Sequence, residues 1–197
     1  MKTYTKTVAT QEPRLVIHHD DTPQSPREWC NLGYFITKER NYKSPDGENA
    51  PEIQQIIEDT AQDATSTEDH MKLIKKAIKE QGEKVLYITP VYRYEHGGVV
   101  YRRGTASGFD YSNCGFYIVT DKTQKECGTP RKLFEKVIDD ELETYTKYAN
   151  GTVYGFVLHD ESGDVIDSCW GFYDIDDIKE YLPKEYKNEN MHDYLKY

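Results

Sequence analysis

The sequence has no long apolar run. No segment of the 197 residues approaches the roughly 18 uninterrupted apolar residues that a membrane-spanning helix needs. The first 13 residues also lack the apolar core of a signal peptide. We therefore expect a cytoplasmic protein with a flexible N-terminal segment, 1–13, and no membrane partner.

Cysteine is scarce and widely spaced. The four cysteines are Cys30, Cys114, Cys127 and Cys169. They form no C-x-x-C pair, so the sequence suggests neither a zinc ribbon nor a small disulfide-bonded scaffold. The densest group of metal-ligand residues is 18–21, HHDD, but adjacent side chains of a strand point to opposite faces and only alternate ones could share a site. We expect no metal and no cofactor.

Common catalytic and nucleotide-binding signatures are also missing. The chain contains no G-x-x-x-x-G-K-[ST] loop, no G-x-G-x-x-G turn, no H-E-x-x-H pair and no EF-hand loop. His96 could act as a general base and Cys114 or Cys127 as a nucleophile, but no spacing matches a known nucleophile motif. These absences favour a binding protein over an enzyme.

Basic residues are fewer than acidic ones. The sequence has 25 lysines and arginines against 35 aspartates and glutamates, a net charge of −10. This balance argues against a protein that coats duplex nucleic acid. Arg102 and Arg103, with Tyr92, Tyr94 and Tyr101 nearby, form the one basic and aromatic cluster that could meet a phosphate or a single strand. Direct nucleic-acid binding is the less favoured alternative.

Helical periodicity occurs in two regions. Apolar residues recur every three to four positions over 51–81, with Pro51 in a first turn and Gly82 as the stop, which predicts two successive helices. A second pattern predicts a long helix over 130–148. The exposed side of this helix carries the acidic residues Glu135, Asp139, Asp140 and Glu143.

The segment 153–173, VYGFVLHDESGDVIDSCWGFY, predicts a β-hairpin. Two apolar strands flank DESGD, in which glycine supplies the backbone angle that the turn needs. A turn centred on Ser162-Gly163 gives the cross-strand pairs Leu158 with Asp167, Phe156 with Cys169, and Gly155 with Trp170. The indole can cover the space that glycine leaves. Asp167 is the odd residue, because a buried carboxylate must find donors or lie at a strand edge.

The elements together predict one α+β domain over 14–183. Strands are expected at 14–19, 84–96, 99–103 and 115–121, with Pro90 at an edge or a bulge, and a short helix or irregular packed segment at 27–37. The hairpin joins an antiparallel sheet packed on one face by helices, with the 130–148 helix as the main cover. A short helix at 174–183 precedes a C-terminal tail or short helix at 184–197. The residues expected to be structural are Trp29, Phe156, Cys169 and Trp170.

Three segments resemble a family of small proteins encoded by bacteriophages, plasmids and other mobile genetic elements. They are PREWCNLG (26–33), YRYEHGG (92–98) and VYGFVL…DSCWGFY (153–173), of which the hairpin is the most specific. The resemblance covers about 26–173. The family has W-D-N-L-G in the first segment, so Cys30 stands where an acidic residue is usual.

The resemblance implies a mobile-element protein in a bacterial host cell, where small acidic proteins often disable host defence. The first function class is a stoichiometric inhibitor of a host defence effector, such as an anti-CRISPR protein that occupies the basic channel of a CRISPR nuclease. Its expected contact surface is the acidic side of the 130–148 helix. A small enzyme acting on nucleic acid or a nucleotide signal, and an accessory nucleic-acid-binding protein, are the alternatives. The polar residues available to such an enzyme are Asp21, Asn31, His96 and Asp167.

Overall fold

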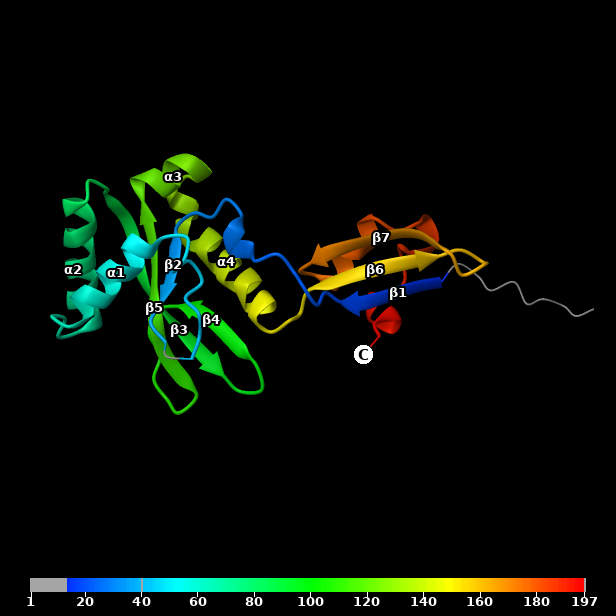
Figure 1. The fold of residues 1–197 in the computed structure, drawn as a ribbon, viewed down its shortest axis with the longest axis horizontal. Helices are drawn as coiled ribbons and strands as arrows, with labels where there is room; N and C mark the ends of the chain where they lie inside the picture. The colour runs from blue at the N-terminus through cyan, green and yellow to red at the C-terminus, as the bar shows by residue number, and fades with distance from the viewer. Residues whose placement is uncertain (1–13, 40, 197) are drawn as a thin grey trace, which may run out of the picture. The chain divides into compact units, whose positions relative to one another are not determined.

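The computed structural model describes residues 14–39 and 41–196, so the predicted flexible segment 1–13 lies outside the described residues. The fold is α+β with two antiparallel sheets, which confirms the predicted class (Figure 1). The chain forms two compact units where we expected one domain. Ser25–Asn150 form the large unit, and the segments Met1–Gln24 and Gly151–Tyr197 together form the small unit.

The large unit is built around a four-stranded antiparallel sheet in the order β2-β5-β3-β4. Its strands are β2 (Tyr34–Thr37), β3 (Val85–Glu95), β4 (Val99–Arg103) and β5 (Tyr111–Thr120). In β5 the residues 116–119 are all buried, although neighbouring side chains of a strand point to opposite faces. Such a continuous apolar run is typical of a strand that is covered on both sides.

Helices cover both faces of this sheet, whereas we expected cover on one face. The helices are α1 (Pro51–Ala61), α2 (Thr67–Glu80), α3 (Asp121–Cys127) and α4 (Phe134–Ala149). Phe116 and Ile118 pack with α1 and α2, while Tyr117 and Val119 pack with α4. The predicted helices over 51–81 and 130–148 are thus present. The apolar sides of α1 and α2 pack on one face of the sheet, and the apolar side of α4 packs on the other.

Two local predictions concern the strands of the large unit. The segment 27–37, predicted to be a short helix or an irregular packed segment, has helical structure only in the 3-10 turn Pro26–Glu28, and residues 29–33 lead without regular structure into β2. Pro90 lies in an inner strand, but β4 pairs only with Val91–Glu95, so Pro90 has one ladder neighbour. The register with β5 also shifts directly after Val91, which agrees with the predicted irregularity.

The small unit contains a three-stranded antiparallel sheet in the order β1-β6-β7. Its strands are β1 (Arg14–His19), β6 (Tyr154–His159) and β7 (Val165–Phe172). The predicted hairpin register is confirmed at all three pairs, Leu158 with Asp167, Phe156 with Cys169, and Gly155 with Trp170. The turn glycine, Gly163, has a φ of 90°, a left-handed conformation that favours glycine.

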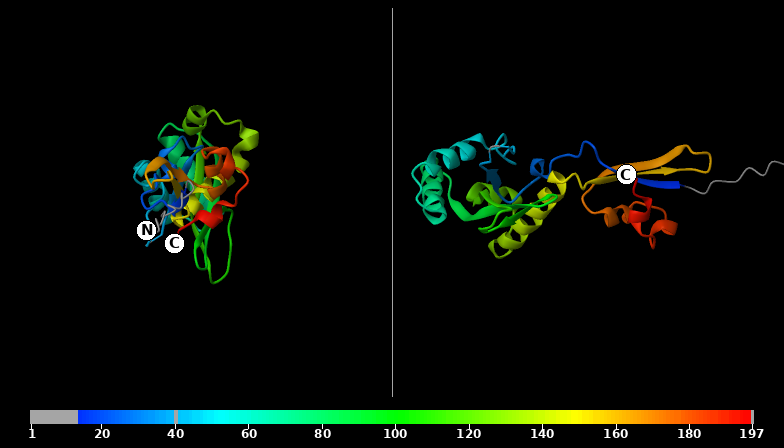
Figure 2. Two further views of the ribbon diagram at one scale, coloured as in Figure 1. Left: turned by 90° about the vertical axis from the view of Figure 1, so that its right-hand side faces the viewer. Right: turned by 90° about the horizontal axis from the view of Figure 1, so that it is seen from below.

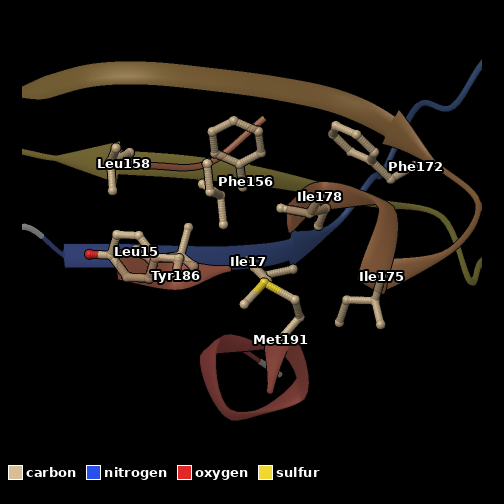
Figure 3. Close-up of a cluster of buried hydrophobic side chains, with 10 residues drawn as sticks. Leu15, Ile17, Phe156, Leu158, Phe172, Ile175, Ile178, Tyr186 and Met191 are labelled. Atoms are coloured by element: carbon tan, nitrogen blue, oxygen red, sulfur yellow. The ribbon is translucent and has the colours of Figure 1, made fainter. Parts of the chain in front are cut away.

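The core of the small unit lies between its sheet and three short 3-10 helices. These are η3 (Ile175–Glu180), η4 (Lys184–Tyr186) and η5 (Met191–Tyr194), and Figure 2 (right) shows them on one side of the sheet. Figure 3 shows Ile17 and Phe156 from the strands meeting Ile178 and Met191 from these helices, all four fully buried. Residues 184–196, predicted to be a tail or a short helix, therefore belong to a core.

The predicted packing of the hairpin against the 130–148 helix is wrong. That helix covers the sheet of the large unit, and the hairpin takes its cover from the C-terminal segment of the small unit. The apolar strands show that cover is required, but they do not show which element supplies it. In the described part of the chain, no helix combines the length and apolar character needed to cross a membrane.

Candidate binding surface

The acidic side of α4 is a mixed-charge surface. Arg103 of β4 donates from Nε and Nη2 to the two carboxylate oxygens of Asp139, at 2.7 and 2.8 Å. Glu135 lies 3.7 Å from the same guanidinium. Lys136 pairs with Asp140, and Lys147 lies 3.6 Å from Glu143. All four predicted contact acids therefore have a basic partner already, which reduces the negative charge that they offer to another protein.

The four polar residues considered for an enzyme do not come together. Asp21 and Asp167 belong to the small unit, and Asn31 and His96 to the large unit. Within the large unit, Asn31 is part of a buried network, whereas His96 is exposed at the β3–β4 turn. No three metal-ligating side chains are close enough to hold a metal ion in the ranges that the structure describes. In the described part of the chain, no hydrogen bond or ion pair joins any two of these four residues.

Asn31 contributes to a buried network around Arg27 that sequence analysis missed. Arg27 is 5% exposed, and its guanidinium donates to both carboxylate oxygens of Asp46 at 2.7 to 3.1 Å. It also donates to Asn31 Oδ1 at 3.0 Å, to Glu141 at 2.8 Å and to the carbonyl of Gly33 at 2.7 Å. The two carboxylates and these hydrogen bonds compensate for the removal of the guanidinium from water.

Tyr117 closes this network from the sheet. Its hydroxyl donates to Glu141 and accepts a hydrogen bond from the Gly33 amide at 3.0 Å. Burial raises the pKa of Tyr117 well above its ordinary value, so the phenol stays protonated and able to donate. Because the five side chains already satisfy one another, the network has a structural role: it fixes residues 26–33 against β5 and α4. In the sequence, the PREWCNLG segment was singled out by its resemblance to a known family. No pattern in the polar loop that contains Asp46 indicated a role for this residue.

Negative charge is concentrated in the small unit. Its 71 residues include 14 acidic and seven basic ones, whereas the 126 residues of the large unit include 21 and 18. The net charges are therefore −7 and −3. The small unit thus has the larger excess of acidic over basic residues, although it is the shorter of the two. It is the part of the protein that would attract a basic partner most strongly.

An apolar patch lies on the outer side of the small unit's sheet. Since Phe156 and Cys169 point into the core, Gly155 and Trp170 point to the opposite face. Trp170 lies over Gly155 so closely that a Cβ at this glycine would be 2.1 Å from its ring, and its ring is 6.2 Å from that of His18. Trp170 nevertheless remains 47% exposed, and Ile166 in the same strand is 57% exposed.

The four residues expected to be structural differ in their exposure. Phe156 is fully buried, and Cys169 is half-buried against the core. Trp170 and Trp29 are about half exposed, at 47% and 48%. The cross-strand pairing correctly places an indole over glycine, but a ring lying flat on an uncovered sheet buries only one of its faces. Trp170 is therefore both a packing residue and an exposed one.

Acidic residues of the hairpin turn and an open strand edge adjoin this patch. In the described residues, none of the turn acids Asp160, Glu161 and Asp164 forms an ion pair, and neither does Asp167, which points to the opposite face of β7 from Trp170. β7 is an outer strand of its sheet, whereas the other outer strand, β1, is bridged by the C-terminal segment at Ile17 and Leu195. We call Ile166, Trp170 and the three turn acids the β7 surface. An exposed tryptophan near charged residues has the composition of a protein-binding surface.

Comparisons of the chain with protein-family models, curated proteins and solved structures gave no match. The β7 surface must be interpreted from its own chemistry.

Proposed function

We propose that the protein is a stoichiometric inhibitor, supplied by a mobile genetic element, that binds a basic surface of a host defence effector. The effector that best fits the resemblance of the sequence is a CRISPR nuclease, whose nucleic-acid channel is lined with lysine and arginine. The observation that carries the proposal is the β7 surface, where an exposed tryptophan of β7 is joined by the unpaired acids of the adjoining hairpin turn.

The two parts of the surface would act at different stages of binding. The unpaired carboxylates would attract a basic channel over a distance of about one Debye length, roughly 10 Å at 0.1 M salt, and accelerate encounter. Trp170 and Ile166 would supply apolar contact area once the surfaces meet, and tryptophan is among the residues that most often dominate interface energy. Bound in this way, the protein would exclude guide or target nucleic acid without chemistry.

The α4 acids are a weaker candidate for the same role. Asp139 is held by Nε and Nη2 of Arg103, and Asp140 and Glu143 pair with lysines of their own helix. A basic partner would have to displace these cations before it could form the same contacts. We therefore place the contact surface on the small unit instead of on α4.

The test is a titration of a purified bacterial CRISPR nuclease. Nuclease activity is measured at increasing ratios of inhibitor to enzyme, and association is followed at low and high salt. We expect inhibition to be complete near one protein per nuclease and association to slow as salt increases.

Two matched charge variants locate the surface. Changing Glu161 and Asp164 to lysine should slow association by roughly tenfold or more, because each change reverses an exposed charge. The same change at Asp140 and Glu143 of α4 is the control and should have a smaller effect. Equal effects would refute the β7 surface. Complete inhibition at far below one equivalent would show that the protein is an enzyme.

A further inference from the structure

A row of four aromatic rings crosses the large unit where β3 and β5 pair. Tyr92 and Tyr94 of β3 lie on either side of Tyr111 of β5, with ring centroids 5.9 and 4.9 Å away. His96 continues the row from Tyr94 at 6.4 Å with an interplanar angle of 21°. We call Tyr92, Tyr94, His96 and Tyr111 the ring row.

The ring row lies on a sheet face that helices cover only in part. Strand alternation places Tyr92 and Tyr94 on the same face as Ile88, which packs with α1 and α2. In Figure 1 the paired strands continue beyond these two helices. Tyr111 is therefore 42% exposed, and Phe109, in the loop that leads into β5, is completely exposed. The large unit thus presents aromatic faces to solvent.

The hydroxyl groups of the ring row are not used within the fold. None of the three tyrosine hydroxyls forms a hydrogen bond to another described residue. By contrast, Tyr87 and Tyr117, which face α4, are both held by carboxylates. The hydroxyls of Tyr87 and Tyr117 are therefore fixed within the fold, whereas those of the ring row are free to contact a ligand.

An unpaired arginine adjoins the ring row. Arg102 of β4 lies opposite Tyr92, is exposed, and makes no ion pair with any described carboxylate. Its neighbour Arg103, on the other face of the strand, is neutralised by Asp139. Both arginines and Tyr92 line a cavity of about 810 Å³ that extends along α4. A positive charge is therefore available next to the rings.

The groups closest to the ring row carry mixed charge. Arg93 lies 3.1 Å from Glu39 and 2.9 Å from Glu95, and Glu95 also accepts a hydrogen bond from the hydroxyl of Tyr42. Asp110 lies 3.8 Å from the imidazole of His96, which is a cation only when protonated. Arg102 is exposed and makes no ion pair with a described carboxylate, so it is the cation beside the rings that can contact a phosphate.

We propose that the ring row binds single-stranded nucleic acid, with bases stacked on the tyrosines and Arg102 at a phosphate. Stacking on aromatic side chains tolerates any base because every base has a flat face. A duplex keeps those faces within its own stack, so the row can bind only unpaired bases. This activity belongs to the large unit and is independent of the β7 surface.

The test is the binding of short fluorescently labelled oligonucleotides of mixed sequence to the full-length protein. Single-stranded DNA, single-stranded RNA and the annealed duplex are compared by fluorescence anisotropy. We expect both single strands to bind more tightly than the duplex. A preference between DNA and RNA would identify the natural strand, since only RNA has a 2′-hydroxyl.

Ring variants distinguish stacking from general charge attraction. Replacing Tyr94 and Tyr111 together with leucine should weaken binding about tenfold or more, whereas replacing both with phenylalanine should preserve it. Arg102→Ala should weaken the binding of oligonucleotides of every sequence to the same extent. It should also reduce the slope of log affinity against log salt concentration by the amount that corresponds to about one phosphate contact. Tyr181→Ala, at an exposed tyrosine of the small unit, is the matched control and should have no effect.

Three results would overturn the proposal. They are absence of single-strand binding by the unchanged protein, equal binding of the duplex, and unchanged binding by the leucine double variant. A fourth result would replace the proposal with another. If oligonucleotides do not bind, a polyarginine peptide does, and the leucine double variant loses the peptide, the ring row is a protein-binding site. Far-ultraviolet circular dichroism confirms that each variant is folded before its binding is compared.

Discussion

Replacing Arg27 with methionine should strongly destabilise the large unit. Methionine has a similar length but no charge and no hydrogen-bond donor, so the change removes the centre of the buried network and keeps most of its volume. Asp46, 4% exposed, would lose the three hydrogen bonds from the guanidinium and retain one from the Phe35 amide, at 2.6 Å. Glu141 would retain its bonds to Leu32 and Tyr117.

The expected cost is about 3–5 kcal/mol, because removing one partner of a buried ion pair leaves the other charge uncompensated. That loss is a large part of the roughly 5–15 kcal/mol that stabilises a typical domain. The control is Lys43→Met. Lys43 lies 2.8 Å from Glu48 with both side chains more than 70% exposed, and such a surface pair contributes about 0–1 kcal/mol.

The assay uses the two tryptophans of the chain, one in each unit: Trp29 in the large unit and Trp170 in the small one. In a Trp170→Phe background, Trp29 fluorescence during urea titration reports the unfolding of the large unit alone. Arg27→Met should lower the unfolding midpoint clearly, and Lys43→Met should barely change it. Equal midpoints for the two variants would refute the inference that Arg27 is the buried centre of a satisfied network.

Two further predictions concern the large unit. Gly115→Ala should lower the urea midpoint seen by Trp29, because a Cβ at this position would lie 2.0 Å from the backbone carbonyl of Ile36, which cannot move without disturbing the sheet; an unchanged midpoint would contradict the register of β2 and β5. The proximity of Cys127 raises the pKa of the Cys30 thiol, so treatment with diamide should join these two as a disulfide. Cys114, whose pKa burial raises to about 12, should stay reduced; peptide mapping that finds Cys114 in the disulfide would show that this proximity is absent.

Local patterns in the sequence predicted the elements that depend on neighbouring residues. The hairpin register followed from a glycine-containing turn and two strands that alternate around it, and both signals lie within 153–173. The helices over 51–81 and 130–148 followed from their apolar spacing in the same way. In each case, the residues that determine the structure are close together in the chain.

Contacts between distant segments could not be predicted in this way. β1 pairs with β6, so residue 14 meets residue 159, and no feature near either residue indicates the other. The Arg27 network likewise joins three segments of the chain, with Asp46 and Glu141 19 and 114 positions away. The division into two units depends on these long-range pairings, which local sequence patterns do not reveal. From the sequence alone, we therefore expected one domain.

The charge of the candidate binding surfaces could not be predicted from local patterns either. The spacing of Glu135, Asp139 and Glu143 correctly indicated one side of a helix, but the cation that neutralises Asp139 comes from β4. The small unit gathers its acids from two ends of the chain, so no single segment displays its excess. Binding a basic protein and binding a nucleic acid require opposite local charges, and because both units are net negative, a site for nucleic acid depends on the local charge of Arg102. The chain's net charge of −10 averages over them and therefore cannot exclude a single-strand site beside Arg102.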